Sequence, residues 1–234
     1  MVRYPVDLDH EAHRLRRERR AVIKAVMFDI GGVLTTGPFE GFARYEREQG
    51  LPEGLIRTIN STNPDTNAWA LFERGQVDFA GFCQLFEAEA RELGYEVDAQ
   101  AVMAAIRGEP RPEMFEAVRF CKSRFKIAAL TNNFASSRER PEANSDIFGL
   151  FDVLIESSKV GVRKPDPRFY ELACEALDVA PTEAVFLDDL GINLKSARQM
   201  GMHTIKVVTG PQAVAELYSV LGVAPEGWEP ETTG

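Results

Sequence analysis

The stretch at residues 24–35 constrains the fold more than any other, because a short apolar run there ends in a single carboxylate. Residues 26–28 are too few for a helix and indicate a strand that is buried on both faces. Asp29 follows at once, and Gly31 and Gly32 leave the next turn free of side chains. Ligands bind where such strands end, and glycines let backbone N–H groups approach an anion. The stretch therefore predicts a binding site at Asp29.

Helix and strand patterns alternate after residue 112. Strands are expected at 125–130, 151–155, 185–187 and 204–208, and helices at 113–124, 167–177, 193–200 and 211–221. Asp166 and Pro167 support one of these helices, since Asp caps helix starts and Pro suits the first helical position. Such alternation indicates a parallel sheet with helices on both faces. The sequence thus predicts an α/β fold with a doubly wound parallel sheet, formed by residues 23–37 and 108–222.

Residues 38–107, called the helical block below, show helical periodicity without a strand signal. Joints rich in Gly, Pro and Thr at 35–38 and 108–112 bracket the block, and such joints suit domain boundaries. We therefore expect an inserted all-helical domain. Its aromatic residues should form its core rather than a ligand site, namely Trp69, Phe72, Phe79, Phe82 and Phe86.

The two ends of the chain lie outside these domains. Residues 1–22 predict a basic helical extension, for which we favour a solvated face over a surface for an anionic partner. His10 and His13 have the spacing of metal ligands on a helix, but they lack a third ligand nearby and are expected to be surface residues. Residues 223–234 are rich in Pro, Glu and Thr and predict a mobile tail.

Charge and cysteine content exclude several functions. The chain of 234 residues carries a net charge of −9, which argues against nucleic acid, because phosphate backbones bind basic surfaces. No apolar run approaches membrane-spanning length, and the N-terminus lacks the apolar centre of a signal peptide. The 3 cysteines are scattered, which favours buried free thiols in a reducing compartment. We therefore expect a cytoplasmic protein without membrane insertion.

Polar groups end three of the predicted strands: Asp29, then Thr131–Asn132, then Asp188–Asp189. The ends of parallel strands meet at one edge of a sheet, so these groups should gather there. Three clustered carboxylates repel one another, and Mg²⁺ fits them because it prefers oxygen ligands and often binds phosphate oxygens as well. Lys164, in a loop just before a helix, can balance the charge of a phosphate. Thr131–Asn132 can donate hydrogen bonds to phosphate oxygens, and Asp29 is placed to attack phosphorus.

Four ordered segments resemble the motifs of the haloacid dehalogenase (HAD) superfamily: Phe28-Asp29-x-Gly31-Gly32-Val33-Leu34, Leu130-Thr131-Asn132, Lys164-Pro165 and Phe186-Leu187-Asp188-Asp189. The resemblance covers roughly residues 24–210, and the helical block is similar to a C1-type cap of that superfamily. Residues 161–167 and 186–195 also resemble the phosphatase-like N-terminal domain of soluble epoxide hydrolases in detail. The resemblance implies a Rossmann-like HAD core and a hydrolase that uses Mg²⁺.

The resemblance also implies roles for individual residues. It makes Asp29 the nucleophile and a metal ligand, and Lys164 the charge-balancing lysine. It makes Asp189 a direct Mg²⁺ ligand, Asp188 a neighbour that binds through water, and the backbone carbonyl of Gly31 a further ligand. It makes Thr131 and Asn132 phosphate binders, and with the glycine turn and the lysine the predicted phosphate-binding residues are Gly31, Gly32, Thr131, Asn132 and Lys164. It gives Asn193 the task of orienting the acidic loop, with a simple helix cap as the alternative.

Gly31 departs from the family pattern, in which a second Asp at this position protonates the leaving group and then activates water. Without that Asp the proton shuttle is lost, and general acid–base help is typically worth about 10²–10⁴-fold in rate. A good leaving group, a substrate hydroxyl or a water could supply the proton instead. A carboxylate of the helical block, such as Glu73 or Glu40, is a further source.

Three functions therefore stay open. The first is a Mg²⁺-dependent phosphatase of a small phosphorylated metabolite that acts through an aspartyl-phosphate; an apolar residue at the cleft would favour a lipid or isoprenoid phosphate. The second is a metal-independent dehalogenase-type hydrolase, against which the pair Asp188–Asp189 argues. The third is a phospholigand-binding pseudo-enzyme with weak turnover, left by the loss at Gly31. A homo-oligomer is compatible with each of them.

Overall fold

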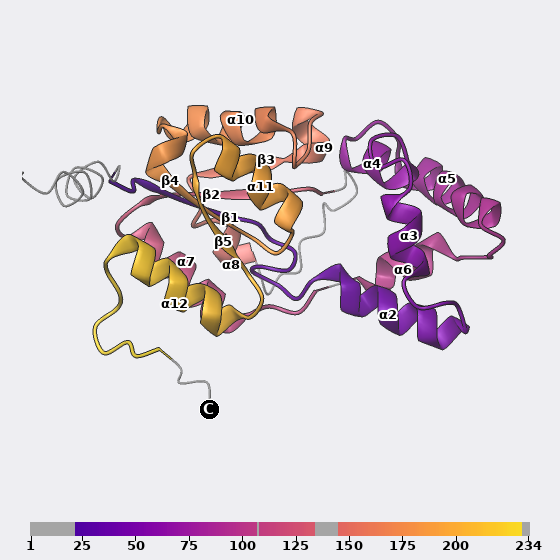
Figure 1. The fold of residues 1–234 in the computed structure, drawn as a ribbon, viewed down its shortest axis with the longest axis horizontal. Coiled ribbons are helices and arrows are strands. Elements are labelled where there is room, and N and C mark those ends of the chain that lie inside the picture. The colour runs from indigo at the N-terminus through magenta and orange to yellow at the C-terminus, as the bar shows by residue number, and fades with distance from the viewer. Residues whose placement is uncertain (1–21, 107, 134–144, 231–234) are drawn as a thin grey trace, which may run out of the picture.

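The computed structural model describes residues 22–106, 108–133 and 145–230, so the predicted basic helix with His10 and His13 lies outside the described residues. Within them a five-stranded parallel sheet has the order β3-β2-β1-β4-β5 (Figure 1). Its strands are β1 (Ala25–Phe28), β2 (Lys126–Thr131), β3 (Val153–Glu156), β4 (Ala184–Asp188) and β5 (His203–Lys206). The predicted parallel α/β sheet is confirmed, with strand ends shifted by one or two residues.

Helices cover both faces of this sheet (Figure 1). One face packs against α7 (Pro112–Lys122), α8 (Ser145–Phe148) and α12 (Gly210–Leu221). The other face packs against α10 (Pro167–Leu177) and α11 (Gly191–Gln199). Val26 and Phe28 point into the first core, and Ala25 and Met27 point into the second. Because side chains alternate along a strand, β1 must be apolar at every position, which confirms the predicted doubly wound sheet.

The helical block follows β1 and forms a core of its own. Its helices are α2 (Pro38–Gln49), α3 (Leu55–Ser61), α4 (Ala68–Glu73), α5 (Phe79–Glu92) and α6 (Ala99–Ala105). Phe72 stacks on Phe82 with ring centroids 4.7 Å apart, and Trp69 meets Phe82 edge-on at 5.6 Å. Phe86 is fully buried beside them, and Phe79 packs on the same cluster. The prediction that these aromatic residues form the core of the block is confirmed.

The two joints of the helical block run side by side. The Thr36 N–H donates to Glu109 O at 2.8 Å, and the Glu109 N–H donates to Thr36 Oγ1 at 2.9 Å. Gly108 is required here, because a Cβ on it would lie 2.4 Å from Thr36 O. The chain therefore leaves the core and returns to it at one place, beside the end of β1.

Some short elements differ from the sequence prediction. Helix α9 (Ser157–Val160) and the 3₁₀ turn η2 (Pro181–Glu183) are too short to produce a periodic pattern. Helix α11 begins at Gly191, with Leu190 at its N-cap position. Asn193 therefore lies inside the helix, and its alternative role as a helix cap is wrong.

The remaining sequence expectations concern thiols, membranes and the tail. All three cysteines, Cys83, Cys121 and Cys174, are buried free thiols, as predicted. Every helix in the described part of the chain is too short or too polar to cross a bilayer. Mobility of the tail at 223–234 stays a prediction, although Trp228 packs edge-on against Tyr218 with ring centroids 5.0 Å apart.

Candidate active site

Three carboxylates meet where β1 and β4 end. These strands pair in register, with Phe28 opposite Leu187, so the residues that follow them arrive side by side. Oxygen atoms of Asp29, Asp188 and Asp189 all lie within 4.8 Å of one another. Asp29 and Asp188 are buried and Asp189 is half-buried. The structure thus brings together the acidic residues that the sequence placed at this edge of the sheet.

Lys164 lies between two of these carboxylates. Its Nζ is 2.8 Å from Oδ2 of Asp29 and 2.8 Å from Oδ2 of Asp188, and it donates to Leu130 O at 3.1 Å. The loop that carries it contains a cis peptide bond between Lys164 and Pro165. Burial works to lower the pKa of Lys164, but Asp188 and Asp29 outweigh that effect and raise the pKa. The ammonium is therefore held in its charged form.

One ammonium does not balance three carboxylates. Burial raises the pKa of Asp29 well above its ordinary value, and the charge of Lys164 only partly counteracts this. Burial, together with the charge of Asp188, raises the pKa of Asp189 to about 6. Excess negative charge in a buried site disfavours ionised carboxylates, so a cation at this place would be stabilising. The donor set of oxygens suits a hard divalent ion such as Mg²⁺.

The two glycines after Asp29 play different parts. Gly32 has a φ of +78°, and a Cβ on it would lie 2.3 Å from Oδ2 of Asp189. A side chain there would therefore displace the acidic cluster. A Cβ on Gly31 would instead meet open space, with no other atom within 4 Å of it. Crowding in this structure therefore does not explain the absence of a second Asp at position 31.

Asn193 contacts the acidic cluster through Asp188. Its Nδ2 lies 3.0 Å from each carboxylate oxygen of Asp188, and the Leu190 N–H donates to Oδ1 of the same residue at 2.7 Å. Tyr170, on α10, donates its hydroxyl to Asn193 O at 2.9 Å. Sequence reasoning missed Tyr170, because its place in an apolar helix pattern does not reveal a buried hydroxyl with a partner.

Asn132 is engaged with protein groups in this structure. Its Oδ1 accepts from the Lys164 N–H at 2.9 Å, and its Nδ2 donates to Lys164 O at 3.1 Å and to Glu73 Oε2 at 3.4 Å. The side chain therefore joins two loops of the site. Thr131, the last residue of β2, is buried beside it.

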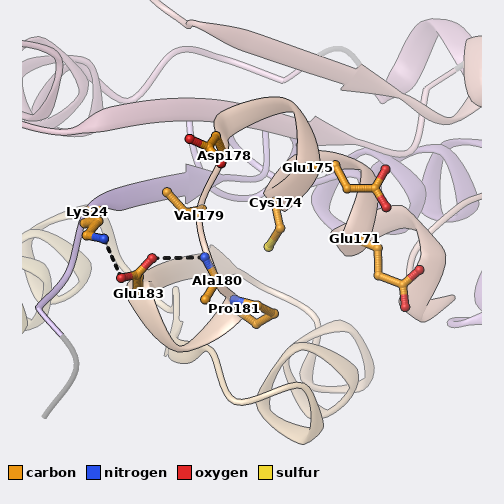
Figure 2. A pocket seen from close by; sticks show the side chains of 9 residues that line it. All are labelled: Lys24, Glu171, Cys174, Glu175, Asp178, Val179, Ala180, Pro181 and Glu183. Carbon is orange, nitrogen blue, oxygen red and sulfur yellow. Dashed lines mark hydrogen bonds and ion pairs between the residues drawn. The ribbon is translucent and has the colours of Figure 1, made fainter. Parts of the chain in front are cut away.

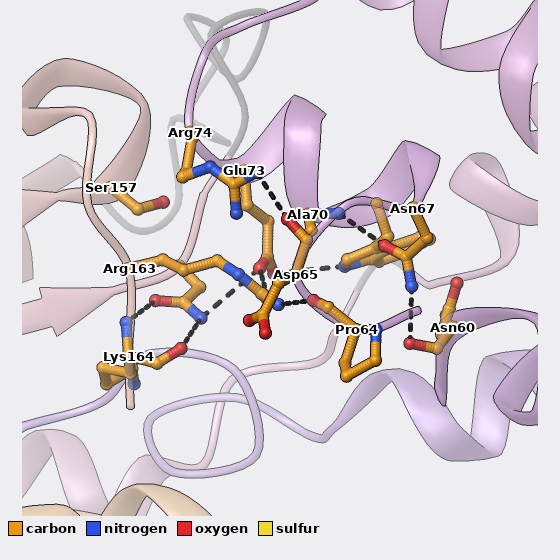
Figure 3. Close-up of polar contacts among 12 residues, drawn as sticks. Asn60, Pro64, Asp65, Asn67, Ala70, Glu73, Arg74, Ser157, Arg163 and Lys164 are labelled. Atoms are coloured by element: carbon orange, nitrogen blue, oxygen red, sulfur yellow. Dashed lines mark hydrogen bonds and ion pairs between the residues drawn. The ribbon is translucent and has the colours of Figure 1, made fainter. Parts of the chain in front are cut away.

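Glu73 is the acidic residue of the helical block that reaches this site (Figure 3). It lies at the end of α4 and forms an ion pair with Arg163, the residue before Lys164. The sequence offered Glu73 and Glu40 as equal candidates, but Glu40 is exposed on α2. Arg163 was missed, because a single Arg in a loop carries no signal of its partner.

A separate hollow of about 530 Å³ lies at the other end of the sheet (Figure 2). Lys24, before β1, and Glu183, before β4, line it together with the end of α10. These residues precede the strands, whereas the acidic cluster follows them. The hollow is therefore not part of the candidate active site.

Known proteins resemble this chain over most of its length. The family model for haloacid dehalogenase-like hydrolases matches residues 23–201. Acyl-CoA dehydrogenase family member 10 of Mus musculus is 35% identical over 205 residues, covering 85% of this chain and 19% of that protein. Bifunctional epoxide hydrolase 2 of Sus scrofa is 30% identical over 217 residues, covering 86% of this chain and 39% of that protein. The chain thus spans well under half the length of these two relatives.

Two further matches extend over nearly whole proteins. Phosphatase MT3486 of Mycobacterium tuberculosis is 31% identical over 224 residues, covering 89% of this chain and 99% of that protein. The structure of an HAD-like family hydrolase from Porphyromonas gingivalis superposes with a TM-score of 0.58 at 23% identity, covering 86% of this chain and 98% of that one. The latter supports the fold alone. With the family model spanning most of the chain, this protein belongs to the haloacid dehalogenase-like hydrolases.

Proposed function

We propose that this chain is a Mg²⁺-dependent phosphatase that cleaves a small phosphomonoester through an aspartyl-phosphate on Asp29. The observation that carries the proposal is the buried cluster of Asp29, Asp188 and Asp189 around Lys164. Three carboxylates with one ammonium suit a divalent cation and a phosphate that arrive together. Relatives named as phosphatases support the reaction class.

The residues present fit a Mg²⁺ ion. Asp29, Asp189 and the carbonyl of Gly31 would hold it, with Asp188 acting through water. When bound, the ion supplies positive charge beside the phosphate oxygens and lowers their repulsion from the attacking carboxylate. The contacts of Asp188 with Lys164 and Asn193 leave it in a supporting position, which agrees with an indirect role.

The chain's own residues account for bond making and breaking. A carboxylate oxygen of Asp29 attacks phosphorus, and the bond from phosphorus to the leaving oxygen breaks. Water then attacks the same phosphorus, releasing inorganic phosphate and restoring the carboxylate. The Ile30 N–H donates to Oδ1 of Asp29 at 2.7 Å, which fixes the orientation of the attacking group. Lys164 lies 2.8 Å from Oδ2 of Asp29 and favours the ionised form of that carboxyl against the effect of burial.

The leaving oxygen must gain a proton, and Gly31 cannot provide it. Both oxygens of Glu73 accept hydrogen bonds, from Trp69 and from Arg163, so Glu73 is an acceptor as it stands. Glu40 is exposed. We therefore favour a water or a substrate hydroxyl as the proton source. Substrates with good leaving groups should react fastest.

The helical block serves in this proposal as a cap that selects substrates. It is inserted directly after the nucleophile's turn, and Glu73 brings it into contact with Asn132. Closure of such an insertion excludes water during attack. The physiological substrate would be a small phosphorylated metabolite whose non-phosphate part contacts the block.

A second function is favoured by one observation, the absence of a carboxylate at Gly31. In that case the chain would bind a phosphorylated ligand with the same residues but turn it over slowly. Loss of acid–base help alone leaves metal and phosphate binding intact.

Phosphate release from a panel of monoesters distinguishes the two functions. We expect Mg²⁺-dependent release from wild type, faster for p-nitrophenyl phosphate than for alkyl phosphates, including isoprenoid phosphates. Gly31→Asp should gain most on alkyl phosphates, since a poor leaving group needs the proton most. No release from wild type, with release from Gly31→Asp, would support the binding protein instead.

A further inference from the structure

Glu73 and Arg163 join the helical block to the core (Figure 3). Arg163 Nη1 lies 2.7 Å from Glu73 Oε2, and the two side chains are only 19% and 9% exposed. The other terminal nitrogen of Arg163 donates to the carbonyl of Pro64, which also belongs to the block. Arg163, which belongs to the core, therefore contacts the helical block at two residues. Because the pair is largely buried, loss of either partner leaves an uncompensated charge.

The same carboxylate reaches the loops of the active site. Oε2 of Glu73 accepts from Asn132 Nδ2 at 3.4 Å, while Trp69 Nε1 donates to Oε1 at 3.1 Å. Asn132 in turn exchanges two hydrogen bonds with the main chain of Lys164. Glu73 is thus bound to its own helix on one side and to both loops of the core on the other.

A close backbone approach lies next to this pair. Gly75, two residues after Glu73, has a φ of +67°, and a Cβ on it would lie 2.7 Å from Ser158 O. Ser158 belongs to α9, which follows β3. The turn that carries Glu73 therefore packs directly on the core, which limits how far the carboxylate can move without undocking the block.

We propose that Arg163 and Glu73 are positioning residues, whose ion pair holds Asn132 and Lys164 in their phosphate-binding arrangement only while the helical block is docked. The inference rests on the proposed function, since these are the loops assigned to phosphate. Undocking removes one of the two acceptors of Asn132 Nδ2, the Glu73 carboxylate, and takes the ion-pair partner away from Arg163, the residue before Lys164. Linkage is reciprocal, so a bound phosphate that orders these loops also stabilises docking of the block.

Positioning and proton donation by Glu73 predict different effects of substitution. Glu73→Gln keeps the size and one of the two accepting oxygens, but it loses the charge that pairs with Arg163 and cannot transfer a proton. A positioning role makes Glu73→Gln milder than Glu73→Ala and makes Arg163→Met as harmful as Glu73→Ala. A proton-donating role makes Glu73→Gln as harmful as Glu73→Ala and spares Arg163→Met.

The experiment measures loop order, phosphate binding and turnover on the full chain. Amide hydrogen exchange is followed in peptides that cover residues 130–133 and 162–166. The affinity for inorganic phosphate in the presence of Mg²⁺ and the kcat/KM for p-nitrophenyl phosphate are measured on the same samples. Arg168→Met is the matched control, because Arg168 follows Arg163 closely in the sequence but pairs with Glu171 and Glu175 on the exposed face of α10.

In Arg163→Met we expect about tenfold faster exchange in both loops and a phosphate Kd that rises about tenfold. The kcat/KM should fall roughly 10- to 100-fold, as misplaced binding groups do. Arg163→Lys, which keeps the charge, should recover most of the protection, and Arg168→Met should match wild type.

Unchanged exchange and phosphate affinity in both Arg163→Met and Glu73→Gln would overturn the inference, whether or not the wild type is a phosphatase. Loss of turnover in Glu73→Gln with full turnover in Arg163→Met would also overturn it and make Glu73 the proton donor. If wild type releases no phosphate from any monoester, the proposed function fails, and the exchange data still decide the positioning role.

Discussion

Nζ of Lys164 lies 2.8 Å from Oδ2 of Asp29, in an ion pair whose side chains are only 1% and 11% exposed. The ammonium lowers the pKa of Asp29 and so works against the effect of burial, which still leaves that pKa well above its ordinary value. The same ammonium also serves Asp188 at 2.8 Å. The ion pair therefore affects both the stability of the fold and the charge of Asp29.

Lys164→Met should destabilise the metal-free protein strongly. It leaves Asp29 and Asp188 buried without a cationic partner, and breaking a buried pair in this way costs about 3–5 kcal/mol. The free energy of unfolding in denaturant at neutral pH measures the loss. Lys24→Met is the matched control, because the pair of Lys24 with Glu183 is partly exposed, at 56% and 23%, and should be worth under about 1 kcal/mol. Equal losses in the two variants would contradict the account of the buried pair.

Substitution by Ala should have little effect at Gly31 but should weaken Mg²⁺ binding at Gly32. Gly31→Ala meets open space and should keep Mg²⁺ affinity within about twofold, because a surface substitution without contacts is usually near neutral. Gly32→Ala places a Cβ against Asp189 at a positive φ and should lower Mg²⁺ affinity by at least about tenfold. Titration of Mg²⁺ by calorimetry compares the two. A tolerant Gly32 with a sensitive Gly31 would be evidence against this placement of Asp189.

The metal-free protein should lose stability as the pH rises from about 4 to about 6. Burial first, and then the charge of Asp188, raise the pKa of Asp189 from 3.8 to about 6. In that window the folded chain binds the proton more tightly than the unfolded chain, so the stabilisation is complete below 3.8 and lost as the pH passes about 6. Melting temperatures with and without Mg²⁺ check this. Because protons and metal compete for the carboxylates, the Mg²⁺-induced rise in Tm should shrink below about pH 6; a rise independent of pH would contradict it.

Asn193→Ala should weaken Mg²⁺ binding by roughly 10- to 100-fold, since groups that orient ligating carboxylates usually have that effect. Asn193 lies 3.0 Å from both oxygens of Asp188, which it would no longer hold. Tyr170→Phe removes only the hydroxyl that fixes the Asn193 backbone, so its effect should be smaller and in the same direction. Calorimetric Mg²⁺ titration provides the measurement, with Tyr218→Phe as the control. Wild-type affinity in Asn193→Ala would show that Asp188 needs no orienting partner.

Much of the core could be predicted from the sequence because its rules are local. A short run that is apolar at every position indicates a strand whose side chains enter the cores on both faces of the sheet. Asp29 directly follows one such run, and Asp188 and Asp189 follow another. Parallel pairing then brings these residues together without further information. The aromatic pattern of the helical block is equally local, and its members pack as expected.

Contacts between the helical block and the sheet core could not be predicted. Arg163 and Glu73 are separated by 90 positions, and neither has a neighbour that identifies the other. The role of Asn193 was ambiguous, because an Asn near a helix start suits both a cap and a carboxylate partner. Only the start of α11 at Gly191 decides between them. The contacts of the Asn132 side chain with Lys164 and Glu73 were likewise not predictable, because they join segments far apart in the sequence.

The most direct test of the central claim is phosphate release from p-nitrophenyl phosphate by wild type and by Asp29→Asn, each with and without Mg²⁺. Asn is close to Asp in size, so metal-independent parts of the fold should persist, which circular dichroism can verify. The account predicts release by wild type only with Mg²⁺, and loss of at least about 10³-fold in Asp29→Asn, because the nucleophile is gone. Release that survives in Asp29→Asn, or that needs no Mg²⁺, would contradict an aspartyl-phosphate mechanism at this site.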